Sequence, residues 1–568
     1  MTALLTDNLP LLAGAPNGIK KLRELILELA VRGKLVEQDA SDEPASELLK
    51  RIAEEKARLV AEGKIKKNKS EEYDATELAY PIPTTWAVAC LGQVVEIVRG
   101  ITFPASEKSR TPEPGRVACL RTANVQDEIE WDDLLFIRES FVSRDDQYVQ
   151  PHDIVMSMAN SRELVGKVAL VGAELAQKTS FGGFLGVLRP VFVEPRFVMA
   201  LLRTPHARSA LIDSSSQTTN IANVSLAKLR PLPFAIPPLA EQHRIVAKVD
   251  ELMDLCDRLE AQQADAVSAH AQLVQALLGS LTQTSDATEF AANWQRLAEH
   301  FHTLFSTEPS IDALKQTLLQ LAVMGKLVPQ DASDEPASEL LERIQAEKRR
   351  LTSEEGLRTT AREDVPAAER NFTLCSGWEC SRLGNLARFI DYRGRTPTKT
   401  ISGIPLITAK NVRPGFISRE PQEFIAEEDY SSWMTRGFPR LGDILFTTEA
   451  PMGNIALIDI AGQFALAQRV ICFQLHELEI GPFLRLAMMS SGFQMQLSDA
   501  ATGMTATGIK SSRLKEIPVP IPPLPEQHRI VAKVDQLMAL CDQLKTQLSQ
   551  ARQLNQQLAS TLVEQAVA

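Results

Sequence analysis

The chain has 568 residues, of which 44% are hydrophobic and 23% are charged, and its formal net charge is −11. This length allows several domains with large cores, and no apolar run approaches the length of a membrane-spanning helix. Without a basic-then-apolar export signal or a C-x-x-C pair among its seven cysteines, the sequence predicts a soluble, cytoplasmic protein that lacks a zinc site.

Two helices and a linker are predicted at the start of the chain. Residues 1–16 are expected to form a flexible leader. Apolar residues at helical spacing predict a helix over Ile19–Val36 with a turn at Gly33, then a second helix over Pro44–Leu59. The basic connector GKIKKNKSEE, which starts at Gly63, is interpreted as a solvated linker, with contact to a phosphate backbone as the alternative.

From Tyr80 the pattern changes to short apolar runs, which predict the strands of a mixed domain. VACLRTANV at Val117–Val125 and DIVMSMAN at Asp153–Asn160 are typical of these runs. One helix is predicted over Pro195–Ile212, because a proline is well tolerated in the first helical turn. A polar loop, Ser214–Phe234, then leads to a longer helix.

That longer helix occurs twice. IPPLAEQHRIVAKVDELMDLCDRLE at Ile236–Glu260 returns 285 residues later as IPPLPEQHRIVAKVDQLMALCDQLK at Ile521–Lys545, with about four in five positions identical. Apolar residues at alternating steps of four and three predict a coiled-coil seam. The seam residues are Ile245, Val249, Leu252, Cys256 and Leu259 in the first copy, and Ile530, Val534, Leu537, Cys541, Leu544 and Leu548 in the second.

A second repeat shows that the whole chain is duplicated. The segment Leu29–Leu59 returns as Leu321–Leu351, 292 residues later, so each unit contains a helical segment, a mixed domain and a long helix. The helices are nearly identical between the units, whereas the mixed domains have diverged. We therefore expect a pseudo-two-fold protein whose helices contact the same partner twice and whose two heads contact different targets.

The repeats also divide the chain into segments. The expected segments are a leader at 1–16, a helical segment and linker at 17–80, a first head at 81–235, a central helical region at 236–375, a second head at 376–520 and a closing helix at 521–568. Lys and Arg balance Asp and Glu within each head, and the acidic surplus lies in the helical parts. The net charge argues mildly against nucleic-acid binding, but this local balance permits it.

No catalytic arrangement is recognisable. The chain lacks the Asn/Asp-Pro-Pro-aromatic motif of adenine methyltransferases and the G-x-x-x-x-G-K-[ST] phosphate loop of ATPases. A nuclease motif is also not credible, because the Glu54-x-Lys56 pair lies inside a charged helix. The sequence predicts a protein that recognises or organises other molecules.

Polar side chains in the loops and at the strand ends of the heads are the candidate DNA contacts. Arg suits guanine edges, Asn and Gln suit adenine, and Lys, Ser and Thr favour phosphates. The candidates in the first head are Arg99, Arg121, Asn124, Asn160, Ser161, Arg162, Gln217, Thr218, Thr219, Asn220 and Asn223. Those in the second head are Arg393, Arg395, Thr396, Lys399, Lys410, Asn411, Thr447, Thr448, Glu449, Thr505, Thr507, Lys510 and Ser511.

The motifs that open and close the heads resemble a known family. P-x-x-W-x4-LG opens the first head, W-x4-LG recurs at Trp378 of the second, and P-P-L-x-E-Q-x-x-I-V-A-K-V-D closes both. These motifs are similar to those of the DNA-specificity subunit of type I restriction–modification systems. The segments LAV-x-GKLV-x-QD-x-x-DEPASELL and GKIKK also resemble that family. The likeness covers nearly the whole chain.

The resemblance implies a fold and a set of partners. It implies two α/β (α+β) target-recognition domains held apart by long antiparallel coiled-coil helices, each reading half of a bipartite double-stranded DNA target. Two methyltransferase (modification) subunits would dock on the helices, with restriction (translocase–nuclease) subunits joining them. S-adenosylmethionine, ATP and magnesium would belong to those partners, with no cofactor in this chain. The candidate partner contacts are Glu241, Gln242, His243, Arg244, Glu526, Gln527, His528 and Arg529.

Two other classes of function remain open at this stage. A non-catalytic coiled-coil scaffold with two protein-binding heads would share the repeats and the seams, but it would show no sequence-selective DNA binding. A solitary methyltransferase or nuclease is disfavoured by the missing motifs.

Overall fold

The computed structural model describes residues 9–66, 78, 80–161, 164–213, 216–218, 221–225, 229–284, 287–354, 365–370, 372–392, 396–502 and 508–567. The chain forms two compact units, residues 1–265 with 552–568, and residues 266–551. It passes from the first unit to the second within α9 (Leu239–Gln283) and returns within α19 (Leu524–Val567). Each long helix therefore contributes one of its ends to each unit.

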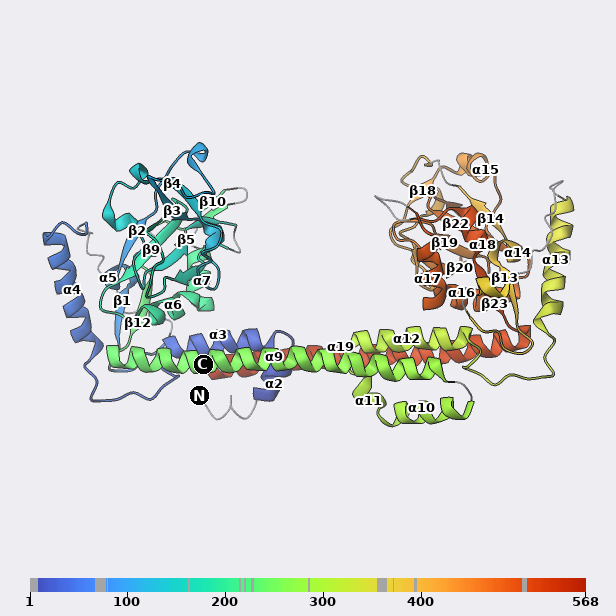
Figure 1. Ribbon diagram of the computed structural model, residues 1–568, viewed down its shortest axis with the longest axis horizontal. Helices are drawn as coiled ribbons and strands as arrows, with labels where there is room; N and C mark the ends of the chain where they lie inside the picture. The colour runs from blue at the N-terminus through green and yellow to red at the C-terminus, as the bar shows by residue number, and fades with distance from the viewer. Residues whose placement is uncertain are drawn as a thin grey trace. The chain divides into compact units, whose positions relative to one another are not determined.

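The first unit consists of a head and a set of helices (Figure 1). A four-stranded antiparallel sheet at the centre of the head has the order β2 (Val95–Arg99), β9 (Leu185–Pro190), β5 (Ile154–Ser157) and β7 (Val168–Leu170). A three-stranded sheet has the order β4 (Leu135–Arg138), β3 (Arg116–Leu120) and β8 (Thr179–Phe181). A third has the order β10 (Ser216–Thr218), β11 (Ile221–Asn223) and β6 (Ala159–Asn160), and β1 (Ala87–Cys90) pairs with β12 (Pro233–Ile236).

The other elements of this unit are helical. The α-helices before α9 are α2 (Leu9–Gly14), α3 (Gly18–Val31), α4 (Ala45–Ala61), α5 (Leu91–Val94), α6 (Pro195–Arg203) and α7 (Pro205–Asp213). Short 3-10 turns are η2 (Ala105–Glu107), η3 (Thr122–Asn124), η4 (Glu139–Phe141) and η5 (Asp145–Gln147).

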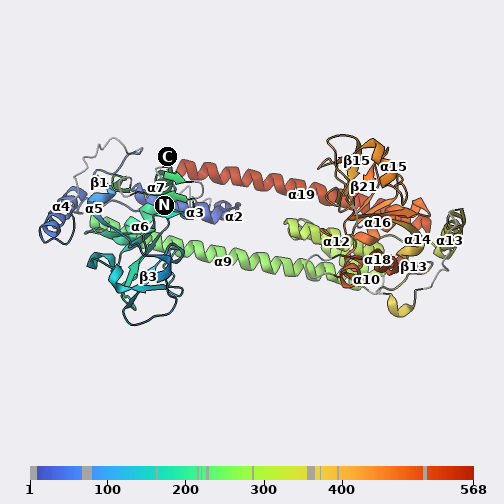
Figure 2. The ribbon, with the colours of Figure 1, turned by 90° about the horizontal axis from the view of Figure 1, so that it is seen from above.

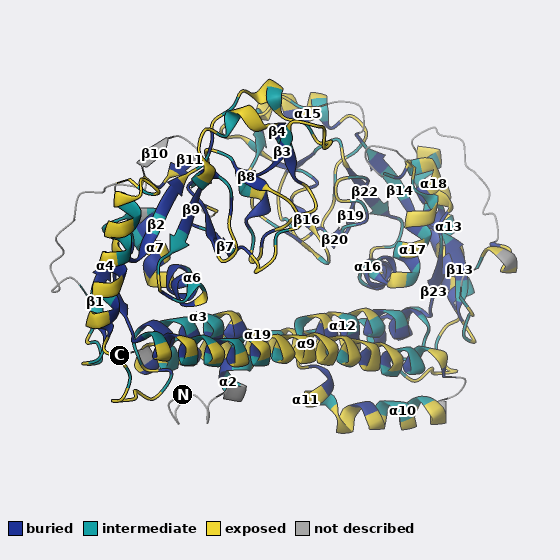
Figure 3. Ribbon diagram, turned by 60° about the vertical axis from the view of Figure 1, so that its left-hand side comes forward, coloured by how far each residue is buried: buried dark blue, intermediate teal, exposed yellow. Residues whose placement is uncertain are grey.

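Alternate side chains of the central sheet serve two separate cores, as the two-residue period of a strand requires. On β5, Ile154 and Met156 pack with the helices α4 and α6, whereas Val155 packs with β3 and β8. All three side chains are fully buried, because layers cover both faces of the sheet. The buried residues appear as dark blue ribbon between exposed loops in Figure 3.

The second unit repeats this arrangement. Its central sheet has the order β14 (Ala387–Asp391), β22 (Val470–Leu475), β19 (Ile444–Thr447) and β20 (Ile455–Leu457). The second sheet has the order β18 (Phe424–Ile425), β15 (Ile404–Ile407) and β21 (Ala465–Leu466), while β13 (Glu379–Arg382) pairs with β23 (Pro518–Ile521). The pair β16 (Val412–Arg413) and β17 (Phe416–Ile417) completes the strands. The matching topologies confirm two copies of one α+β head.

Helices again surround the strands of this unit. The α-helices before α19 are α10 (Ala287–Glu299), α11 (Phe301–Leu304), α12 (Glu308–Val323), α13 (Ala337–Glu354), α14 (Leu383–Leu386), α15 (Tyr430–Trp433), α16 (Gly481–Met489), α17 (Ser491–Ala500) and α18 (Ser511–Glu516). The 3-10 turns are η6 (Ala367–Glu369), η7 (Glu427–Asp429) and η8 (Leu478–Ile480).

The predicted seam residues of the long helices are buried or partly buried, and a shorter helix packs on each seam. In the first unit the α9 seam shares a core with α3, and both helices can be followed in Figure 2. Arg23 of α3 forms ion pairs of 2.6 Å with Asp257 and with Glu260 of α9. In the second unit the α19 seam shares a core with α12, where Lys545 of α19 forms an ion pair of 3.1 Å with Asp312. The seam of α9 is interrupted after Leu259, where residues 260–269 are exposed, and the helix is buried again at Val274, Leu278 and Leu281 in the second unit.

Two local features of the first unit differ from the sequence predictions, and a third confirms one of them. Leu9–Gly14 of the expected flexible leader is the helix α2, because Leu12 is buried against α3. The single helix expected over Pro195–Ile212 is broken before Pro205, which has no N–H to continue it. The predicted turn at Gly33 is confirmed. Its φ is +71°, and a Cβ there would lie 2.5 Å from Pro83.

A buried histidine makes the stability of the second head depend on pH. Burial is the largest of the causes that lower the pKa of His476 to about 4, and the nearby cations Lys348 and Arg440 lower it further. In the unfolded chain histidine titrates near pH 6.5, so between pH 6.5 and 4 only the unfolded chain gains the proton. The free energy of unfolding therefore falls as the pH falls through this window.

Between pH 7 and 4.5, we expect the free energy of unfolding of the His476→Val variant to fall by about 2 kcal/mol less than that of the wild type. Val191 is the matched residue of the first head: its N–H donates to Val94 O at 2.9 Å, as His476 N–H donates to Leu386 O at 3.0 Å. Hydrogen exchange of the β22 amides measures the opening free energy of this head alone. Equal pH slopes in the wild type and the variant would contradict the assignment.

Candidate nucleic-acid interface

A cavity of about 900 Å³ opens on the first head where four segments meet. These segments are the end of β2, the loop before β3, the turn between β8 and β9, and the region after β11. Its lining includes Arg99, Lys108, Arg110 and Arg121, together with the polar side chains of Thr122 and Asn223. A concave surface with several cations and few acids is suited to a polyanion.

The cations of this cavity differ in how far the head itself neutralises them. Arg121 donates to the Asp133 carboxylate and to the Asp133 carbonyl, so its positive charge is partly neutralised within the head. Among the residues that the structure describes, Arg99, Lys108 and Arg110 form no ion pair with a carboxylate. Cys119 also lines the cavity, but burial raises the pKa of its thiol to about 12, so it stays protonated and is a poor nucleophile.

The structure brings together part of the set predicted for the first head. Arg99, Arg121 and Asn223 line the cavity. Asn160 lies in β6 and is paired with Ala222 of β11, and its side-chain oxygen accepts a bond of 2.9 Å from the N–H of the exposed Ser161. Gln217 and Thr218 are described only as backbone of β10, while Arg162, Thr219 and Asn220 lie outside the described residues.

Two predicted asparagines are internal structural residues. Asn124 is 2% exposed and its side chain accepts from Arg121 N–H and donates to Glu130 O and Asp133 O. Asn411 of the second head is also 2% exposed, with the same pattern of internal bonds. Both amides hold the loop after a strand, so neither faces a ligand in this conformation.

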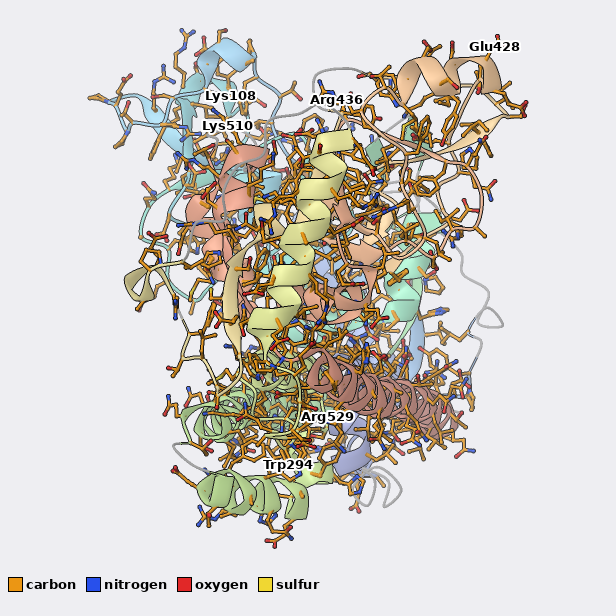
Figure 4. The ribbon with its side chains drawn as sticks, turned by 90° about the vertical axis from the view of Figure 1, so that its right-hand side faces the viewer. Lys108, Trp294, Glu428, Arg436, Lys510 and Arg529 are labelled. Carbon is orange, nitrogen blue, oxygen red and sulfur yellow. The ribbon has the colours of Figure 1, made fainter. Side chains whose placement is uncertain are left out.

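In the second head the exposed candidates lie on several loops. Thr396 donates to Gln468, and Lys399 forms an ion pair of 2.7 Å with Glu423. Lys410 is exposed, and Lys510 precedes Ser511, the first residue of α18. Figure 4 places Lys510 and Arg436 in the upper part of this unit, away from Arg529 on α19. Arg393, Arg395, Thr505 and Thr507 lie outside the described residues.

Three of the predicted contacts, residues 447–449, lie at the end of β19, and they differ in how far they are buried. Thr447 and Thr448 are 0% and 1% exposed, and the Thr447 hydroxyl accepts from Asn454 N–H at 2.9 Å. Glu449 is partly exposed and forms an ion pair of 2.8 Å with Arg469. Of these three predicted contacts, only Glu449 has its side chain at the surface.

The repeated EQHR residues at the start of each long helix fasten a head to its helices. In the second unit Trp378 Nε1 donates to Glu526 at 3.0 Å, and Arg529 forms an ion pair of 2.6 Å with Asp334. Gln527 is fully buried and donates to Pro522 O at 2.9 Å. Burial is the main cause that raises the pKa of Glu526, which the Trp378 bond partly offsets.

The first unit has the same junction. Glu241 and Gln242 are both 0% exposed, and Arg244 forms an ion pair of 2.6 Å with Asp42. Burial raises the pKa of Glu241, as it does at the matching position of the second unit. His243 is the outward member of the set, with 60% of its side chain exposed. His528 is its counterpart, at 57%.

Sequence reasoning missed several residues of these surfaces. Lys108 and Arg110 of the loop SEKSR line the cavity but are not among the predicted contacts. Their basic side chains are the sequence signal that could have identified them. Phe184 lines the cavity with 66% of its surface exposed. A polar-residue search gives no reason to select a phenylalanine, so only the structure identifies it.

The described part of the chain holds no group of three or more His, Cys, Asp or Glu side chains that could bind a metal ion. Within the same residues, none of the helices combines the length and the apolar character needed to cross a bilayer.

The family model and the sequence relatives that match this chain agree on one family. The family model for the type I restriction modification DNA specificity domain matches residues 83–269 and 376–551. The EcoAI and EcoEI type I restriction enzyme specificity subunits of Escherichia coli are 36% and 34% identical to this chain, each alignment covering 97% of this chain and 94% of the relative. The crystal structure of the HsdS subunit from Thermoanaerobacter tengcongensis is similar with a TM-score of 0.40 and 18% identity, covering 87% of this chain and 99% of that one.

Proposed function

The chain belongs to the family of type I restriction–modification DNA specificity subunits, and on this premise we propose that its two heads bind the two halves of a bipartite DNA target. The chain itself performs no catalysis. Its function is to select the DNA on which the catalytic subunits of its complex act.

One observation carries this proposal: two heads of the same topology differ in their outward side chains. The strand orders match in the central sheet, in the three-stranded sheet that contains β3 or β15, and in the pair that closes each head. Among the described residues, the sheet β10-β11-β6 and the pair β16-β17 each occur in one head. The first head presents Arg99, Lys108 and Arg110 around its cavity, and the second presents different polar groups such as Lys410 and Lys510. Two copies of one scaffold with different surfaces suit a target with two different halves.

The near-identical helices support two identical partners. We place two methyltransferase subunits on the helical regions, with restriction subunits joining them. Because Glu241, Gln242, Glu526 and Gln527 are buried within their own units, their role in docking is to shape the junction. The exposed neighbours His243 and His528 are then the direct contacts. S-adenosylmethionine, ATP and magnesium belong to the partners.

The acidic chain should bind DNA weakly without its partners. We expect tight, sequence-selective binding only when the methyltransferase subunits are present, since they supply further cationic surface and enclose the DNA. Gel shifts of the full chain with and without the methyltransferase subunit, on target and scrambled duplexes at fixed salt, measure this. Mapping of methylated adenines in the host genome then gives the target, which should consist of two separated half-sites.

The alternative, a scaffold whose heads bind proteins, makes the opposite prediction for the same experiment. It requires no difference between target and scrambled duplexes when the partner is present. If the isolated chain bound its target selectively with nanomolar affinity, the expected need for the methyltransferase subunits would be wrong. The proposal that the heads recognise DNA would still hold.

A further inference from the structure

The turn that follows the parallel strand β8 in the first head has an exact structural counterpart after β21 in the second. Gly182 N–H donates to Leu120 O at 2.9 Å, and Ala467 N–H donates to Ile407 O at the same distance. Leu185 N–H closes the first turn by donating to Gly182 O at 2.8 Å. The corresponding bond of the second turn, from Val470 N–H to Ala467 O, is 3.2 Å.

The third residue of each turn is held to the neighbouring strand by its carbonyl. Phe184 O accepts from Met158 N–H at 2.8 Å, and Arg469 O accepts from Thr448 N–H at 3.0 Å. Phe184 and Arg469 are therefore at the same position of the two heads. Because their backbone is fixed by the sheet, their side chains project from a rigid base.

The two side chains at this position have opposite chemistry. Phe184 is 66% exposed at the edge of the cationic cavity, beside the small Gly182 and Gly183. Arg469 is 49% exposed and paired with Glu449, and Ala159 stands where Glu449 stands in the second head. Among the described residues of the head, no aromatic or cation–π partner accounts for the exposed Phe184 ring. The Arg469 guanidinium, held by a carboxylate, can still donate to a planar acceptor.

We infer that position 184 in the first head and position 469 in the second each recognise one base of their half-site, Phe184 the methyl group of a thymine and Arg469 the O6 and N7 edge of a guanine. This inference rests on the DNA recognition proposed above and adds the residues that determine specificity. The apolar ring of Phe184 can contact the methyl group that distinguishes thymine, while the Arg469 guanidinium can donate two parallel bonds to guanine. Glu449 keeps that fork in one orientation.

A graft between the heads tests the inference directly. Ala159→Glu with Phe184→Arg places the second head's pair at the matching position of the first head. We expect the full chain, assembled with its methyltransferase subunit, to change its preference at one base of the first half-site from T to G by about tenfold. The second half-site is the internal control, and its preference should stay the same.

Two further measurements keep the test independent of the graft's folding. Replacing single thymines of the first half-site by uracil removes only the methyl group, and at one position this should weaken wild-type binding about fourfold. Arg469→Lys keeps the charge but loses the fork, so it should relax the preference for G at one base of the second half-site. Phe184→Leu, which preserves an apolar contact, is the matched variant and should retain the T.

The outcomes separate this inference from the proposed function. A wild-type complex without a bipartite target would overturn the proposed function itself. A bipartite target whose base preferences are unchanged in the graft and in Arg469→Lys, or weakening that is equal for every sequence, overturns only the assignment of Phe184 and Arg469. If uracil has no effect on binding at any position, the proposed thymine contact of Phe184 is overturned.

Discussion

Exchange of residues 83–236 for the corresponding head of another specificity subunit is expected to replace the first half of the DNA target and leave the second half unchanged. The physical reason is the separation of the cores: the strands and helices of each head pack within one unit, and the two units divide at 265/266 and 551/552. The core that the central sheet shares with β3 and β8 lies entirely within the exchanged segment, whereas α4, which packs on the other core, stays in place. Mapping of methylated sites in a strain with the chimaera measures both halves in one experiment.

The junctions follow from the pairing of the first and last strands of the head. Ala87 is opposite Ile236 and Cys90 is opposite Pro233, so β1 and β12 should be moved together. The donor head should retain a tryptophan at position 86, because Trp86 and Phe197 stack edge to face where the head rests on α3. The matched control is the same exchange of the second head between β13 and β23, where Trp378 and Phe483 form the equivalent pair.

The two chimaeras should give complementary results. The first alters only the first half-site and the second alters only the second. A chimaera that changes both half-sites, or neither, would show that recognition is shared between heads and would contradict the division into two independent readers.

The repeats explain how much of this architecture follows from sequence. The duplicated segments predict two units and two heads, and the seam over Ile245–Leu259 predicts which side of α9 is buried. The packing of α3 on that seam was not predicted, since α3 lies far away in the chain and its apolar face fits any helix of suitable length. The early break at Pro205 was missed because the apolar spacing continues across it.

The candidate DNA contacts show where residue type stops being informative. Asn124 and Asn411 have the chemistry to bind adenine, yet their amides satisfy loop carbonyls inside the head. An asparagine that stabilises a turn and one that recognises a base have the same local pattern, so only burial separates them. Phe184 is the converse case, because its importance depends on exposure, which a sequence does not give.

Insertion of one heptad into both long helices is expected to lengthen the gap between the two half-sites while both halves are still recognised. Both α9 and α19 pass from one unit to the other, and we expect their length to set the distance between the half-sites that the heads recognise. Seven residues add about 10 Å of helix, which corresponds to about three base pairs of DNA rise. The exposed residues 260–269 of α9 and the region near Gln547 of α19 are the sites for the insertions, because a heptad keeps the seams on either side in phase.

The twist of DNA sets a limit on this change. Three base pairs rotate the duplex by about 100°, whereas a heptad rotates a helix by only about 20° relative to the seam. We therefore expect methylated sites whose gap is longer by about one to three base pairs, at a reduced rate of modification. Insertion into α9 alone is the matched control, and it should abolish activity because the two connections then differ in length. An unchanged gap with full activity in the double insertion would mean that the helices do not set the spacing of the target.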